Sequence, residues 1–327
     1  MKWSVGGAAV LAALVGVSTP VFAGFQASDL IYLPVAAHKV GVGGCLWRTD
    51  LYITNSDVTA IDVSMFFLLS GGGSNASRLQ RQLGAGGREE EGWGTLDENL
   101  ADIPPNGTLL IEDVVCQYWI DQGGEECATA TALGAIVIFA YEAGTLDSAD
   151  GPVYRNAVVN SRTYNETTNW VPDGEDPPGF VEEPVTYGQT VQGVPWYNQA
   201  DPAAINELGD FTFELLNGGA ENEIFRYNVG ILNSSDLQTS VQLLLQPFQP
   251  DGTPFLDEEG NELGSVVTLP PLGHIQYNRI LVSVFGLTDV TNAMIKVSFV
   301  RWTSTSPDPI PYFTAYGSFV DGRSGDP

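Results

Sequence analysis

Apolar and polar residues alternate over short stretches along most of the chain. One face of the first clear stretch carries Trp47, Leu51 and Ile53, and the opposite face carries Arg48 and Asp50. Because successive side chains of a strand point to opposite faces, this period of two predicts a half-buried β-strand. An Asn-Ser pair then predicts a turn, and the alternation resumes after it.

The same pattern occurs twice. The segment WRTDLYITNSDVTAIDVSMFFL (47–68) aligns without gaps to FRYNVGILNSSDLQTSVQLLLQ (225–246), with Arg48 matching Arg226. Further pairs of blocks follow in the same order, which predicts an internal duplication. These pairs are 103–115 with 269–281, 134–140 with 292–298, and 157–165 with 318–326.

The duplication defines the expected organisation of the chain. Each unit offers several short strands, with short helical pieces at 112–120 and 278–285, so we expect an all-β protein. The prediction is two tandem antiparallel β-sandwiches, immunoglobulin-like, with a jelly roll as the alternative. The expected segments are a signal peptide at 1–23, unit one at 29–165 with insertions near 70–100 and 116–127, a Pro/Gly/acidic linker or strap at 166–209, and unit two at 210–327.

The N-terminus has the pattern of a secretory signal peptide. Lys2 precedes an apolar run from Val5 to Val17, and Val21 and Ala23 form a small-residue cleavage site. The run is too short to span a bilayer, and no later apolar stretch reaches that length. We therefore expect export, cleavage after Ala23 and no membrane span in the mature chain. The extracellular space or the cell surface is the expected location, with the periplasm as the alternative.

Acidic residues dominate the charge. The 327 residues include 40 Asp and Glu but 13 Lys and Arg, a formal charge of −27, which argues against nucleic-acid binding. Acidic clusters at 89–91, 173–176 and 257–259 lack the Asp-x-Asp-x-Asp-Gly spacing of a calcium loop. A solvated, self-repelling surface is the simpler interpretation, so we expect no cofactor, and calcium is kept as an alternative because it prefers several oxygen ligands.

Cysteine pairing is expected in an exported chain. Cys116 and Cys127 bracket the second insertion of unit one. A disulfide there would stabilise the fold by about 3 kcal/mol, because it lowers the entropy of the unfolded chain. We predict this pair, with Cys45 bonded to either partner as the alternative. If it stays unpaired, Cys45 is a free thiol.

Four arginines occupy matched positions in the two units. Each has an acid or an amide two residues away on the same strand face. The predicted role is a structural polar ladder between strands, and a ligand clasp in each unit is the alternative. The ladder comprises Arg48, Asp50, Asn160 and Arg162 in unit one, and Arg226, Asn228, Asp321 and Arg323 in unit two.

Aromatic residues gather in or near the predicted strap. Trp170, Tyr187, Trp196 and Tyr197 could form a platform that stacks on sugar rings. The alternative, which we favour, is that they pin the strap onto the sandwiches.

Several strings in the chain resemble an uncharacterised family of exported bacterial tandem β-sandwich repeat proteins. The likeness covers most of the mature chain and implies an extracellular, non-catalytic module of unknown ligand. The strings are LPVAAH…WRTDLYITNS, IPPNGTLLIEDVV, NSRTYN…TYGQ, FRYNVGILNSSD, LPPLGHIQYNRI and SFVDGRSGDP.

Enzyme motifs are scarce. The chain has no Gly-x-Ser-x-Gly, His-Glu-x-x-His or phosphate-binding glycine loop, and its two histidines, His38 and His274, are predicted to be turn or surface residues. We therefore predict a non-catalytic secreted or cell-surface structural or adhesion module whose partner is an extracellular protein or glycan. Carbohydrate binding through the strap aromatics is the alternative, and a calcium-rigidified extracellular spacer is the second alternative.

Overall fold

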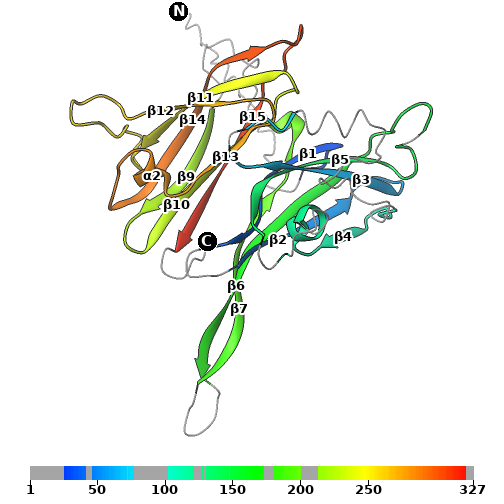
Figure 1. Ribbon diagram of the computed structural model, residues 1–327, viewed down its shortest axis with the longest axis horizontal. Helices are drawn as coiled ribbons and strands as arrows, with labels where there is room; N and C mark the ends of the chain where they lie inside the picture. Colours follow the sequence, from blue (N-terminus) through cyan, green and yellow to red (C-terminus); the bar gives the residue numbers. More distant parts are fainter. Residues whose placement is uncertain are drawn as a thin grey trace, which may run out of the picture.

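The computed structural model describes residues 26–41, 46–71, 73–76, 102–120, 127, 130–146, 148–172, 180–199 and 213–321 (Figure 1). These residues form an all-β protein of antiparallel sheets, as the alternating pattern predicts. Short helical turns occur at Cys116–Ile120, Trp196–Asn198 and Ile280–Ser283 (α2).

Unit one folds around a single core. Its strands pair in the order β3-β5-β1-β2-β6-β7, with β4 on β2 and β8 on β1. Because β1 pairs with β5 along most of its length and with β2 at its end, it joins the two layers of the sandwich. The strands are β1 (Leu30–Val40), β2 (Leu46–Asn55), β3 (Ile61–Leu69), β4 (Thr108–Ile111), β5 (Ala132–Glu142), β6 (Ala157–Pro172), β7 (Phe180–Gln192) and β8 (Val194–Pro195).

Unit two is a sandwich of two sheets, ordered β13-β10-β15 and β12-β11-β14-β9. Along β11 every second residue is buried, as the alternation predicts, and these side chains meet those of β10 and β14 in a second core. The strands are β9 (Phe213–Glu221), β10 (Phe225–Asn233), β11 (Thr239–Phe248), β12 (Ser265–Leu269), β13 (His274–Tyr277), β14 (Val290–Ser304) and β15 (Phe313–Asp321).

The pairing order of unit one recurs in unit two. The order β4-β2-β6 corresponds to β13-β10-β15, and β3-β5-β1 corresponds to β11-β14-β9. This agreement supports the duplication, which stays a prediction.

The sequence alignment of two blocks is out of register with the strands. Ala157 lies opposite Asn55, and Phe313 lies opposite Asn233, so Ala157 corresponds to Phe313 and not to Ser318. The third block slips by three residues in the same way, because Phe67 faces Ile136 whereas Leu245 faces Val297. Both slips are odd, and an odd slip exchanges the inward and outward faces of a strand. Burial of the apolar face therefore determines the true register.

The Asn-Ser turns are held by a buried asparagine in each unit. The Asn55 amide donates to the carbonyl oxygens of Thr59 and Ile103 at 2.8 and 2.9 Å, and its Oδ1 accepts from the Asp57 N–H. Asn55 and its counterpart Asn233 are both fully buried, so their hydrogen bonds are shielded from water. In unit two, the Asn233 amide donates to the carbonyl oxygens of Thr239, Leu269 and Pro270.

The predicted linker at 166–209 differs from the structure. Strands β6 and β7 pair from Asn160–Gln192 to Pro172–Phe180 and form a long hairpin that projects from the body (Figure 1). Runs of Thr, Val and Tyr support strands here, and Pro184 is tolerated because β7 is an edge strand. Residues 173–179 and 200–209 lie outside the described part of the chain.

The two units share a buried apolar interface. Tyr32, Phe66 and Leu68 of unit one cluster with Leu232 and Leu272 of unit two. Four hydrogen bonds among the described residues cross it. Asn75 Nδ2 donates to the Leu272 carbonyl at 2.8 Å, the Gly71 N–H to the His274 carbonyl at 3.0 Å, and the Ser74 hydroxyl to the Pro271 carbonyl at 3.1 Å. The fourth joins His274 Nε2 and the Pro34 carbonyl at 3.1 Å. The apolar contacts and the directional hydrogen bonds therefore hold the two units in one relative position.

The prediction that His274 is a turn or surface residue is wrong. It begins β13, is fully buried and stacks its ring on Tyr316, with centroids 6.4 Å apart. The Tyr316 ring in turn covers Gly230, where an added Cβ would lie 2.0 Å from the ring. Burial lowers the pKa of His274 to about 4.

We predict a pH-dependent stability that depends on His274. The unfolded residue takes up a proton below about pH 6.5, whereas the folded residue does so below about pH 4, so the unfolded state binds more protons in this window. The contribution of His274 should therefore lower the free energy of unfolding by about 3 kcal/mol as the pH drops through this window. Urea unfolding of wild type and His274→Gln between about pH 7 and pH 4 measures the difference in slope.

Glu214 provides the control for this measurement. Burial raises its pKa to about 7, so the contribution of Glu214 to stability changes with pH in the opposite direction. Glu214→Gln should steepen the loss of stability toward low pH. Equal pH slopes for wild type and His274→Gln would contradict the assignment.

Replacing Asn233 with alanine should destabilise the fold by about 3 kcal/mol, because three buried carbonyl oxygens lose a donor. Denaturant unfolding measures the loss. Asn55→Ala should act in the same direction, whereas Gln238→Ala, at an exposed position of the same turn region, should leave the free energy of unfolding unchanged. An Asn233→Ala protein as stable as wild type would exclude the proposed role of the amide.

Candidate binding cleft

A cleft of about 390 Å³ opens between the two units. One wall is the outer face of the β13-β10-β15 sheet, with Arg226 and Gln276, and it continues to Arg279 in the turn after β13. The facing wall is the end of β1 and the start of β2, with Lys39 and Trp47. The volume of the cleft falls in the range of small-ligand pockets in proteins.

Strand alternation places these side chains. On β10, Tyr227 and Val229 point into the core of unit two, so Arg226 and Asn228 point outward toward unit one. On β1, Lys39 lines the cleft, whereas its neighbour His38 points away from it. The cleft therefore forms where two outward strand faces meet.

The charge of the cleft is opposite to that of the chain. Lys39, Arg226 and Arg279 line it, and no carboxylate does so among the described residues. The guanidinium of Arg279 is bonded to Glu221, with both Nε and Nη2 2.7 Å from Oε1. Arg226 Nε is buried and has no hydrogen-bond partner among the residues that the structure describes. Arg226 also forms no ion pair with a carboxylate among the described residues, so its charge is suited to an anionic ligand.

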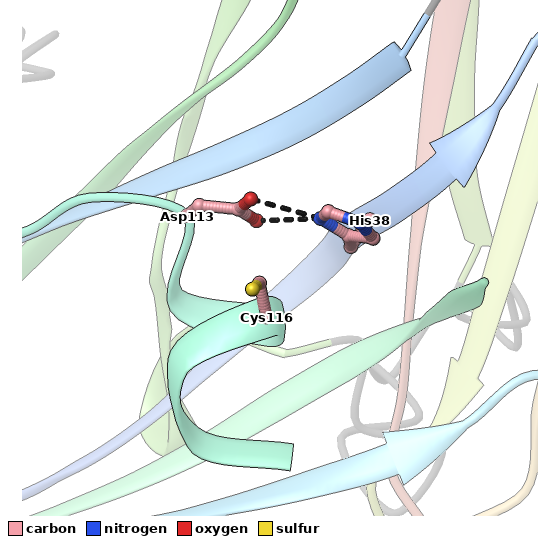
Figure 2. A group of neighbouring side chains, drawn as sticks. All are labelled: His38, Asp113 and Cys116. Atoms are coloured by element: carbon pink, nitrogen blue, oxygen red, sulfur yellow. Dashed lines mark hydrogen bonds and ion pairs between the residues drawn. The ribbon is translucent and has the colours of Figure 1, made fainter. Parts of the chain in front are cut away.

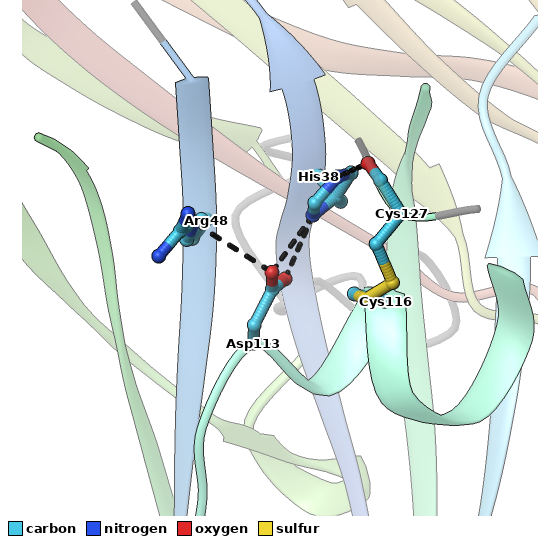
Figure 3. The surroundings of a disulfide bond; sticks show 5 residues. All are labelled: His38, Arg48, Asp113, Cys116 and Cys127. Carbon is cyan, nitrogen blue, oxygen red and sulfur yellow. Dashed lines mark hydrogen bonds and ion pairs between the residues drawn. A yellow bond between two sulfur atoms is a disulfide. The ribbon is translucent and has the colours of Figure 1, made fainter. Parts of the chain in front are cut away.

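The corresponding place in unit one is internally paired. Arg48, the counterpart of Arg226, lies with its Nε 3.8 Å from Asp113 Oδ2, and His38 Nδ1 lies 2.8 Å from the same oxygen (Figure 3). Asp113 joins β4 to the short helical turn that follows. Burial raises the pKa of Asp113, whereas the nearby His38 and Arg48 act to lower it.

His38 is buried on β1, so its prediction as a turn or surface residue is also wrong. Its Nδ1 meets both carboxylate oxygens of Asp113, and its Nε2 lies 2.6 Å from the Cys127 carbonyl oxygen (Figure 3). Both ring nitrogens are therefore engaged in bonds that hold β1 to the segment of the second insertion.

The predicted Cys116–Cys127 disulfide is present, with Cα atoms 5.6 Å apart. His38, Asp113 and Cys116 bring one ligand atom each within 4.8 Å of one another, a spacing that could hold a metal ion (Figure 2). The Cys116 sulfur is committed to the disulfide, so it offers no thiolate to a metal. Cys45 lies outside the described residues.

The polar ladder between strands stays a prediction, and two of its residues bond to turns. Asp50 Oδ1 accepts a hydrogen bond from the Asp113 N–H at 2.9 Å, and Asn228 Oδ1 accepts one from the Arg279 N–H at 3.0 Å. Asp113 and Arg279 both have positive φ, 44° and 56°, so the two side chains stabilise equivalent strained turns.

The other ladder residues lie on β6 and β15. Arg162 lies opposite Asp50 and over the Tyr164 ring, 4.9 Å from its centroid. Asn160 lies opposite Tyr52, Asp321 ends β15, and Arg323 lies outside the described residues. In the strand register Arg162 corresponds to Ser318, so its match to Arg323 is wrong, for the same reason as the odd slip above.

The four predicted platform aromatics are divided between the β6–β7 hairpin and the short helical turn at Trp196–Asn198. Trp196 and Tyr197 are exposed neighbours that bond to Asp29 and to the Ala27 carbonyl, which pins them to the start of unit one. Trp170 and Tyr187 lie on the β6–β7 hairpin, and Trp170 pairs with Glu182, about 30 Å along the strand from Gln192. The side chains of 166–187 are outside the described part.

Of the acidic clusters, 89–91 and 173–176 lie outside the described residues. In the third, Asp257 accepts hydrogen bonds from the Asn261 side chain and from the N–H groups of Asn261 and Glu259, which lowers its pKa. Its carboxylate thus closes its own turn.

Sequence reasoning missed Lys39, Trp47, Asp113 and Arg279. A signal for two of them existed, because the alignment of 103–115 with 269–281 matches Asp113 to Arg279. Lys39 and Trp47 could not be found in this way, since their role depends on how the units dock.

No protein-family model, curated protein or solved structure matches the chain. The resemblance to the exported repeat family therefore stays a prediction. Within the described residues, no helix is both long and apolar enough to cross a membrane.

Replacing Cys116 and Cys127 together with serine should lower the free energy of unfolding by about 3 kcal/mol, because a loop with a sequence separation of 11 is released in the unfolded chain. Denaturant titration with and without a dithiol reductant measures this loss. Cys45→Ser is the control and should leave stability unchanged. A wild type that is equally stable when reduced would contradict the expectation.

Proposed function

We propose that the protein is a non-catalytic secreted or cell-surface structural or adhesion module. The observation that carries this proposal is the interface between the units, where an apolar cluster and four hydrogen bonds of the described residues join two sandwiches. A joint of this kind resists bending, because both its apolar burial and its hydrogen bonds would be lost on opening. Such stiffness suits a chain that holds a binding surface away from its attachment.

The state of the two histidines supports a role without catalysis. Both ring nitrogens of His38 are bonded, and His274 is fully buried with a lowered pKa. Neither imidazole is placed to exchange protons with a substrate in water. The disulfide supports export, because such bonds persist in oxidising compartments.

Uncoupling the units tests the proposal. Leu232→Asp places a charge in the apolar interface cluster, where Leu232 is fully buried, and should separate the units. We expect wild type to unfold in one calorimetric transition and to be retained saturably on isolated cell envelopes. The Leu232→Asp protein should show two transitions and weaker retention.

Leu256→Asp is the matched control, because this leucine of unit two is 53% exposed. It should behave as wild type in both assays. Turnover of glycoside, ester or peptide substrates by the purified mature chain would overturn the proposal, as would a lack of saturable retention.

A further inference from the structure

The two units differ in charge at equivalent places. Arg48 and Arg226 occupy the same position on β2 and β10, and Asp113 and Arg279 follow β4 and β13 at the same position. The acid that faces Arg48 in unit one is thus an arginine in unit two. Asp50 is likewise replaced by the neutral Asn228. A locally paired cluster in unit one becomes a cationic one in unit two.

This cationic cluster opens on the cleft. The only carboxylate bonded to it among the described residues is Glu221, which is engaged with Arg279. Arg226 and Lys39 therefore add positive charge to a small volume on a chain of formal charge −27. Cations kept together inside an acidic protein attract an anion, since their mutual repulsion otherwise raises the free energy.

We propose that the cleft between the units binds a carboxylate-bearing sugar, with Arg226 as the main anchor of the carboxylate. A guanidinium matches the two oxygens of a carboxylate in a bidentate pair, and Arg226 lines the cleft without an ion pair to any carboxylate of the described residues. Lys39, exposed at the rim, adds a second charge.

The other lining residues favour a sugar over a simple inorganic anion. Trp47 offers an aromatic ring of the kind that stacks on sugar faces. Asn228, Gln276 and Asn278 supply amides, which can donate to and accept from hydroxyl groups. A volume of about 390 Å³ admits one or two sugar rings and not a folded partner.

Apolar residues complete the walls. Val35, Val40 and Val320 line the cleft beside the polar groups, so a bound carboxylate would lie partly out of water. Charge-assisted hydrogen bonds are stronger under these conditions. The ligand class is therefore an acidic sugar with one negative group at Arg226 and its ring against Trp47.

The inference rests on the proposed adhesion role and names its ligand class. Isothermal titration of the full mature chain with digalacturonate, with neutral digalactose as the reference, tests it. We expect saturable binding of the acidic disaccharide that weakens as the salt concentration rises. Arg226→Gln should weaken it by about 10-fold or more, and Lys39→Gln by a smaller factor.

Arg301→Gln is the matched control, because Arg301 lies exposed on β14 and bonds to Gln242, away from the cleft lining. It should bind as wild type. The melting temperature of each variant shows that it is folded, and Arg226→Lys, which keeps the charge but not the fork, should recover part of the affinity.

Three outcomes would overturn the inference: no binding of digalacturonate, equal binding of the neutral disaccharide, or equal losses in the Arg226 and Arg301 variants. None of them changes the retention of the chain on cell envelopes or the response of that retention to Leu232→Asp. The cleft and the adhesion role can therefore fail separately.

Discussion

The outer face of the β13-β10-β15 sheet is the surface on which the whole arrangement depends. A sheet with one face in its own core still exposes the other, and here unit one covers part of that second face. At one end the covering is apolar and hydrogen-bonded, around Leu232 and His274. At the other end it stays open and cationic, around Arg226. Closure at one end thus creates the cleft at the other, so the proposed stiffness and the proposed ligand site have a common origin.

The strands were the most predictable part of the structure. Alternation around Leu51 and Val241, together with the Asn-Ser turns, predicts β2, β3, β10 and β11, because burial of one face imposes a period of two. Register was less predictable. Short resemblances such as NSRTYN with DGRSGD misplace a strand by an odd number of residues, and only the core reveals the error.

The site was less predictable than the fold, for reasons of sequence distance. His38 meets Asp113 across 75 residues, and His274 meets Pro34 across 240. No local pattern encodes such contacts, so both histidines were expected to be turn or surface residues. The matched arginines were the most informative residues, yet one interpretation did not suit both units. Arg48 forms an ion pair with Asp113, whereas Arg226 forms no ion pair with a carboxylate among the described residues. The predicted duplication would leave one copy free to change its chemistry while the other keeps the architecture.

Gly230, on β10, connects the apolar end and the cationic end of this sheet face. The Tyr316 ring covers it, and the same ring stacks on His274 and lines the cleft. Any β-carbon at this position would lift the tyrosine, and the displacement would reach the joint and the binding surface together. A substitution of Gly230 would therefore disturb the interface and the cleft at once, so we expect this position to be among the least tolerant of substitution in the molecule.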